Sequence, residues 1–149
     1  PYDHVWDMYY DEFDNDDDIV AKVVPYDREN IYKARTPFYD QAARQMSYKA
    51  RPALILAKAD NDDYVVLPVS SVTNRSNIDP VYDIEIDPVL YPRLNLRNIS
   101  YVRTHKQTVV HRANLRDEIG DLKSEYEDLY LEILEKREAF SNSITQQAL

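Results

Sequence analysis

The sequence predicts an α+β domain in which an antiparallel sheet is followed by a C-terminal amphipathic helix. Two runs rich in Val, Ile and Leu, at 51–58 and 64–71, flank a polar tip of turn-forming residues, which is the pattern of a β-hairpin. Apolar and acidic residues alternate over 82–87, as in a half-buried strand. Apolar residues recur at helical spacing over 115–140, so we expect a helix there.

The N-terminal part of the chain predicts one strand and a long connection. Residues 1–18 carry eight acidic residues, no Lys or Arg and several aromatic rings, a composition that favours a flexible segment or one that docks on a basic groove or a partner. A short strand is expected at 18–25, ended by Pro25. The connection at 26–49 is expected to hold a helical turn or two at 42–46. Its cations alternate with aromatic residues, a mixture that suits single-stranded nucleic acid or any long surface loop.

The predicted hairpin places functional side chains at one end of the sheet. Antiparallel pairing about the tip brings Arg51, at the start of the first strand, close to Ser70 and Ser71, at the end of the second. A guanidinium and a hydroxyl at this position could hold a phosphodiester. Pro68 predicts an edge or a bulge just before Ser70, and a register slip of one residue would exchange the two serines.

The C-terminal half predicts further short strands before the helix. Residues 99–104 and 107–111 are expected to form two strands or one bent strand. Asn114 has the character of an N-cap for the helix at 115–140. Gly120 then falls inside this helix, where it should cost about 1 kcal/mol relative to Ala.

Composition excludes several classes of function. The chain has no cysteine, which excludes disulfides, thiolate metal sites and cysteine nucleophiles, and its single glycine argues against glycine-rich phosphate loops. No apolar run approaches the ~20 residues that span a bilayer, and no signal peptide is recognisable, so a cytoplasmic location is expected. The net charge is −9, but residues 31–116 hold 13 Lys and Arg against 8 acids. This basic centre is compatible with a phosphate backbone, or with ordinary variation between segments.

Six segments follow one another along the chain in an order that is more specific than any one of them alone. They are a strand at 17–24, Arg-Pro at 51–52, the strand end at 67–71, the alternating run at 83–87, the basic run at 101–106 and the helix at 115–140. The order resembles the MazF/PemK family of toxin endoribonucleases. Members often carry Glu-Gln-x-Gly-x before the Arg-Pro, where this chain has Met-Ser-Tyr-Lys-Ala.

The resemblance implies a small SH3-like antiparallel β-barrel, similar to MazF and CcdB, with a C-terminal amphipathic helix. This domain would span 17–140, between an acidic aromatic segment at 1–16 and a polar tail at 141–149. It further implies cleavage of single-stranded RNA without metal or cofactor, control by an antitoxin, and a homodimer. By this match Arg51 and Ser70 carry the catalysis. The candidates for RNA binding are Lys49, Ser71, Arg75, Arg103, His105 and Lys106.

The same residues are also compatible with other interpretations. Arg51 could form a salt bridge with Asp83 or Glu85 at a strand edge, and His105 could be an ordinary surface histidine. The chain could be an inactive relative, acting as a binding or regulatory module whose groove is occupied by the acidic segment, or an unrelated α+β interaction domain. Convergence of Arg51 and Ser70 in an open basic cleft would favour the nuclease.

Overall fold

The computed structural model describes residues 30–149. The strand expected at 18–25 and the acidic segment at 1–16 therefore lie outside the described residues. Within the described range, the elements follow one another in this order: β1 Asn30–Asp40, β2 Gln45–Lys58, β3 Asp63–Ser70, η1 Arg75–Asn77, β4 Asp83–Ile86, η2 Pro92–Leu94, β5 Ser100–Arg103, β6 Thr108–His111, η3 Arg112–Asn114, β7 Leu115–Asp121, α4 Leu122–Glu125 and α5 Glu127–Ala148.

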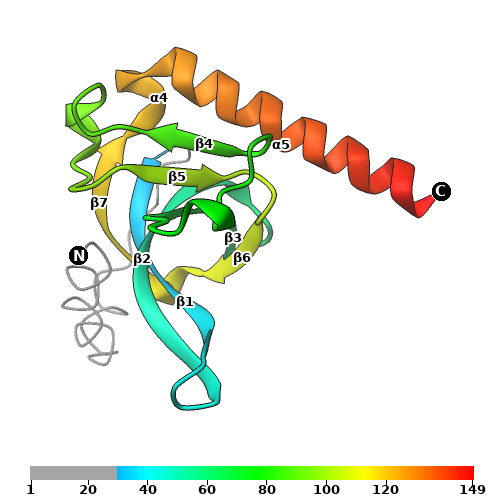
Figure 1. Ribbon diagram of the computed structural model, residues 1–149. Coiled ribbons are helices and arrows are strands. Elements are labelled where there is room, and N and C mark those ends of the chain that lie inside the picture. Colours follow the sequence, from blue (N-terminus) through cyan, green and yellow to red (C-terminus); the bar gives the residue numbers. More distant parts are fainter. Residues whose placement is uncertain (1–29) are drawn as a thin grey trace.

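The strands of the described residues form one curled antiparallel sheet, a half-barrel with a helix across it (Figure 1). The strand order is β4-β5-β3-β2-β1-β7, with β6 as an additional partner of β3. Along its outer side β3 pairs first with β6, over residues 63–66, and then with β5, over residues 69–70. Pro68 lies in the gap between these two partners, where a residue without an N–H group is tolerated. The sheet therefore divides into two arms at this proline.

Because the sheet curls, it buries side chains on both faces. The larger core lies between the sheet and the C-terminal helices, and its fully buried members include Ile31, Leu54, Leu67, Ile86, Leu94, Leu122 and Ile133. The smaller core fills the inner curve of the sheet with Tyr32, Ala34, Ala53, Ile55, Tyr64, Val66, Val110 and Leu115. The alternation of side chains along β1 and β2 supplies both cores at once.

The described part of the connection expected at 26–49 is instead a long β-hairpin, made by β1 and the first half of β2. The two strands pair without a break from Ile31↔Leu54 to Asp40↔Gln45. The carboxylate of Asp40 closes the turn by accepting the N–H groups of residues 42 and 43, as an Asx turn does. Arg44 completes the turn with a φ of 55°. The helical turn expected at 42–46 is therefore wrong, and the hairpin projects from the body of the sheet (Figure 1).

The helix expected at 115–140 is also wrong at both ends. Its first seven residues form β7, which pairs with β1 from Asn30↔Asp121 to Ala34↔Leu115. Asn114 ends η3 and caps no α-helix; the capping residue is Asp121, whose carboxylate accepts the N–H of Ser124 at 3.1 Å. The partner strand β1 explains the difference, because a strand edge that needs hydrogen bonds recruits the segment beside it.

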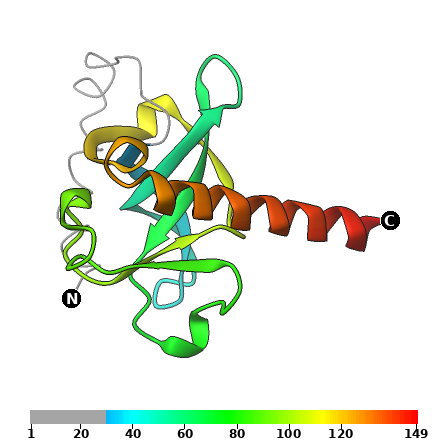
Figure 2. The same cartoon turned by 90° about the horizontal axis from the view of Figure 1, so that it is seen from above.

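The long helix α5 continues to Ala148, through the residues expected as a polar tail. Its first half packs on the sheet through Leu129, Tyr130 and Ile133, and its last turns extend past the body of the molecule (Figures 1 and 2).

The remaining elements agree with the sequence-based expectations. The hairpin of β2 and β3 pairs from Ala53↔Pro68 to Lys58↔Tyr64, and Asp60 closes its tip by accepting the N–H groups of residues 62 and 63. The strands expected at 82–87, 99–104 and 107–111 are β4, β5 and β6.

Candidate active site

Arg51 and Ser70 meet in a pocket at the open end of the β2–β3 hairpin. The register Ala53↔Pro68, continued by two residues, places Arg51 opposite Ser70 on the same face of the sheet. Both side chains line a pocket of about 410 Å³. Asp83 and Glu85, the alternative partners of Arg51, are engaged elsewhere, with Arg103 and Tyr101 respectively. The convergence expected from the hairpin is therefore present.

A second wall of the pocket comes from β1, which sequence reasoning had interpreted as a loop. Thr36, Pro37 and Phe38 line the pocket beside Arg51. The ring of Phe38 lies under two cations, with the Lys49 Nζ at 4.9 Å and the Arg51 Cζ at 5.9 Å from its centroid. Such contacts stabilise cations at partly exposed sites. Lys49 thus stands next to the pocket, held beside Arg51 by a shared aromatic ring.

The third wall forms where β3 changes partner. Arg103 at the end of β5, Lys106 in the connection and Thr108 at the start of β6 line the pocket with Pro68. Arg103 is held by Asp83, whose two carboxylate oxygens accept its Nε and Nη2, each at 3.1 Å. The backbone carbonyl of Asn77 accepts a further hydrogen bond from Nη2 at 2.8 Å.

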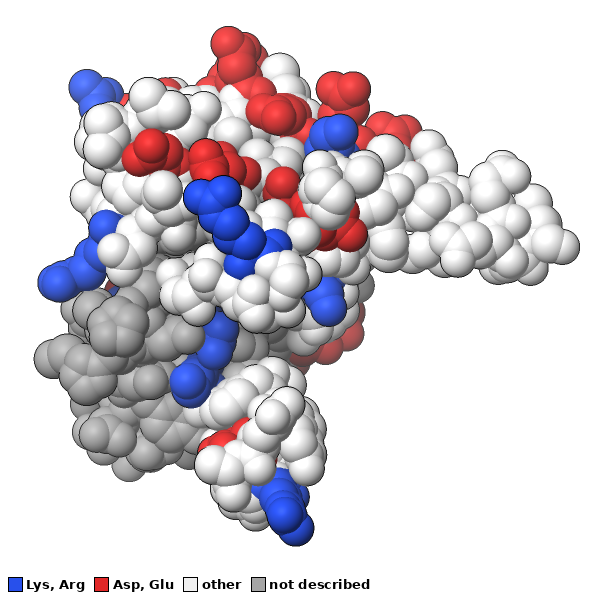
Figure 3. Space-filling view, viewed as in Figure 1, with Lys and Arg blue, Asp and Glu red and all other residues white. Residues whose placement is uncertain are grey.

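The lining of the pocket is cationic. Among the nine described residues that form it, three are Arg or Lys and none is an Asp or Glu. On the visible face of the molecule, acidic side chains gather over α5 and its surroundings, and basic side chains lie below them across the sheet (Figure 3). A partly enclosed group of cations attracts anions such as phosphate.

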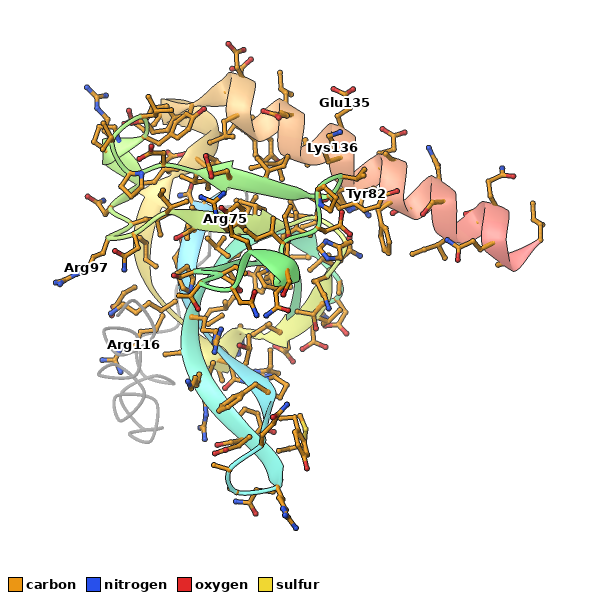
Figure 4. All side chains as sticks on the ribbon, viewed as in Figure 1. Arg75, Tyr82, Arg97, Arg116, Glu135 and Lys136 are labelled. Atoms are coloured by element: carbon orange, nitrogen blue, oxygen red, sulfur yellow. The ribbon has the colours of Figure 1, made fainter. Side chains whose placement is uncertain are left out.

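The remaining RNA-binding candidates lie outside the pocket lining. Ser71 lies just beyond the end of β3. Of the two serines, Ser70 is the one among the described lining residues. Arg75 lies in η1, in front of β5 (Figure 4), near enough to Tyr101 to oppose the rise in the pKa of that phenol. Burial and the hydrogen bond to Glu85 cause this rise.

His105 belongs to a cluster under α5 and not to the pocket. Its ring lies 6.0 Å from that of Tyr82 and 6.1 Å from that of Phe140, and these two partners meet edge to face at 5.0 Å. Figure 4 shows Tyr82 beside the helix. Burial lowers the pKa of His105, although the nearby Asp83, with its Oδ1 3.7 Å from Nδ1, acts in the opposite direction. Its place in the fold is that of a packed, neutral histidine.

Thr36, Phe38, Pro68 and Thr108 line the pocket but were missed as site residues. The alternation of cations and aromatics in residues 32–49 was the available signal for the β1 wall, but it gave no register. Nothing in the local sequence marks Thr108.

The described residues hold no group of three or more His, Cys, Asp or Glu that could bind a metal ion. None of their helices has the length and apolar character needed to cross a membrane.

Comparisons with known proteins concern the family and the fold of the chain. The family model described as PemK-like, MazF-like toxin of type II toxin–antitoxin system matches residues 27–135. Among solved structures, the chain is similar to the Mycobacterium tuberculosis toxin MazF-mt6, with a TM-score of 0.50 and 18% sequence identity, over 78% of this chain and 96% of that chain. The search of curated proteins found no match.

The structural likeness confirms the predicted fold, a curled antiparallel half-barrel of the MazF type with a C-terminal helix. Since the family model covers well over half of the sequence, the chain belongs to the PemK-like, MazF-like toxins of type II toxin–antitoxin systems.

Proposed function

We propose that this protein is an endoribonuclease that cleaves single-stranded RNA without a metal ion and is controlled by an antitoxin protein. The observation that carries the proposal is the convergence of Arg51 and Ser70 in a cationic pocket that also holds Arg103 and Lys106. Membership of the toxin family supports the same function in general terms. By the same family argument, the protein works in the cytoplasm as a homodimer.

The chemistry is an internal displacement at phosphorus. The 2′-oxygen forms a bond to the adjacent phosphorus, the bond to the 5′-oxygen breaks, and the products carry a 2′,3′-cyclic phosphate and a 5′-hydroxyl. The 2′-hydroxyl loses its proton and the leaving 5′-oxygen gains one. The attacking nucleophile belongs to the substrate itself, so the protein needs to supply neither a water nor a metal ion.

The pocket residues have distinct roles in this reaction. The planar fork of Arg51 matches two phosphate oxygens and stabilises the charge that grows on them, or it assists departure of the 5′-oxygen as an acid. Ser70 donates a hydrogen bond to the phosphate or orients the 2′-hydroxyl. Among the described residues, the lining includes neither histidine nor carboxylate, the usual general bases. The role that these residues are suited to is stabilisation of the phosphorane charge.

The test is cleavage of a long single-stranded RNA in EDTA. We expect discrete cuts by the wild type, and Arg51→Ala should slow cleavage by about 10²–10³-fold, the usual cost of one oxyanion donor. Arg51→Lys should remain impaired because a lysine lacks the bidentate fork. Arg97→Ala is the matched control, since this exposed arginine points away from the body (Figure 4). A 2′-deoxynucleotide at the cut site should abolish cleavage there.

Absence of cleavage by a folded wild type would refute the nuclease and would leave a binding or regulatory module. Equal loss of activity in Arg51→Ala and Arg97→Ala would refute the assignment of the site.

A further inference from the structure

Part of the Arg103 guanidinium is buried in an ion pair with Asp83, and the side chain of Arg103 also lines the candidate pocket. We infer that Asp83 is a positioning residue, which fixes Arg103 so that one nitrogen of its guanidinium remains available to the phosphate of a bound nucleic acid. The inference rests on the proposed function, since it names the second phosphate-binding arginine of the same pocket and the residue that orients it.

The hydrogen bonds of the guanidinium account for all but two of its five N–H groups. Nε donates to Asp83 Oδ1, and the two N–H groups of Nη2 donate to Asp83 Oδ2 and to the carbonyl of Asn77. Within the described residues, Nη1 donates to no protein group. The side chain is 20% exposed and lines the pocket, and the inferred role requires that the two remaining N–H groups face it.

Asp83 is held as firmly as the arginine that it orients. Its side chain is 0% exposed, and its Oδ2 also accepts the backbone N–H of Asp79 at 2.8 Å. The strand register places Asp83 directly opposite Arg103 on β4 and β5. A carboxylate with this many fixed donors leaves the arginine one orientation, and little rotational freedom is lost when phosphate binds.

The ion pair gains little stability by being buried. Desolvation offsets much of the attraction between two buried charges, so a pair of apolar residues would fill the same space at similar stability. The Asp83–Arg103 pair faces a cationic pocket, where it keeps a second cation beside Arg51. The Asp83 charge also reduces the repulsion between Arg103 and the other cations of the lining.

The experiment is a double-mutant cycle on binding. The variants are Asp83→Asn, Arg103→Gln and the double variant, and the probe is a single-stranded DNA of about 20 nucleotides, a length that exceeds one binding site and cannot be cut by 2′-hydroxyl attack. Each single substitution should weaken binding by about 10- to 100-fold, the range for hydrogen bonds to charged groups. The double variant should bind within about twofold of Arg103→Gln, because Asp83 acts through Arg103.

Glu85→Gln is the matched control. Glu85 lies two residues along β4 and accepts a hydrogen bond from Tyr101 at 3.1 Å, so its loss removes a carboxylate from the same strand without touching Arg103. It should bind the DNA as the wild type does. If Asp83→Asn weakens binding by the same factor in the Arg103→Gln background as in the wild type, Asp83 does not act through Arg103. That result would show a merely structural role for Asp83 and overturn the inference.

A measurement on the wild type covers the case in which Asp83→Asn does not fold. The Arg103 Nε–H, identified by its loss in Arg103→Gln, should exchange slowly with solvent in the free protein and shift when the DNA is added, whereas that of the exposed Arg97 should exchange fast. Equal exchange of the two groups would overturn the inference.

The failures of the two proposals are distinguishable. Binding with the expected coupling but no RNA cleavage would refute the nuclease and support the role of Asp83. RNA cleavage together with additive effects of the two substitutions on binding would support the nuclease and refute the role of Asp83. Absence of DNA binding by the wild type would also overturn the role of Asp83.

Discussion

Gly120→Ala should destabilise the protein, because Gly120 lies where two segments of backbone approach closely. An alanine Cβ at this position would lie 2.9 Å from the Leu94 Cα and 3.2 Å from the Arg93 carbonyl oxygen. Optimal contacts between carbon atoms are about 3.5–4.0 Å, so β7 and η2 would have to separate by about 0.6–1 Å. The contacted atoms belong mainly to the backbone, which cannot move aside as the end of a flexible side chain can.

The magnitude follows from two opposing effects. Inserting a methyl group into a packed site costs about 1–3 kcal/mol. Gly120 does not have a positive φ, so alanine adopts its backbone conformation without strain and gains about 0.4–1 kcal/mol from the lower freedom of the unfolded chain. The difference between the middles of these two ranges is a net loss of about 1.3 kcal/mol, which for a protein of this size lowers the Tm by about 3–5 °C.

The assay is urea unfolding followed by circular dichroism, with thermal unfolding as a second measure. Glu132→Ala is the control, since this residue lies on α5 with an exposed side chain and should change stability by no more than about 0.5 kcal/mol. A Gly120→Ala variant as stable as the wild type, or more stable, would refute the argument from close approach.

Two further predictions concern the charged groups. Burial lowers the pKa of His105, so the unfolded chain binds a proton first as the pH falls below the ordinary value of about 6.5. The free energy of unfolding should be fully retained above that pH and decline below it. His105→Gln should flatten this decline in urea titrations between about pH 7.5 and 5.5, and an unchanged slope would contradict the prediction. Lys106 lines the pocket, so Lys106→Ala should reduce the slope of log affinity for single-stranded DNA against log salt by about 0.7. Arg97→Ala should leave that slope unchanged, and equal slopes for Lys106→Ala and the wild type would remove Lys106 from the interface.

The parts of the fold around the candidate site that the sequence predicts depend on local pairing. The turn at Asp60 fixes the hairpin and brings Arg51 to the end of the sheet that carries Ser70 and Ser71. The register at the tip, Lys58↔Tyr64, would set Ser71 opposite Arg51. A bulge between Ile55 and Ala57 shifts the pairing by one residue, so Ser70 takes that place, and the local sequence does not mark this bulge. The strands β4 to β6 were recognisable for a similar reason, since each is a short apolar or alternating run bounded by polar residues.

The parts that were missed depend on pairing between distant segments. β1 contains Pro37 and several polar residues, so its composition resembles a loop, and its partners are β2 and the distant β7. The segment of β7 is ambiguous, because Leu115, Ile119 and Leu122 also satisfy a helical period. The Asp83–Arg103 pair was missed because it requires the register of two strands that no tight turn connects.

The gap at Pro68, between the two partners of β3, divides the candidate pocket into two parts that come from different segments of the chain. Arg51 and Ser70 lie on the paired strands β2 and β3, whereas Lys106 lies in the connection from β5 to β6 that crosses the gap, and Thr108 lies at the start of β6. Changes in the length or sequence of that connection would reshape one side of the pocket and leave the paired arginine and serine in place. Under the proposed function, a new nucleotide preference can therefore arise while Arg51 and Ser70 keep their positions.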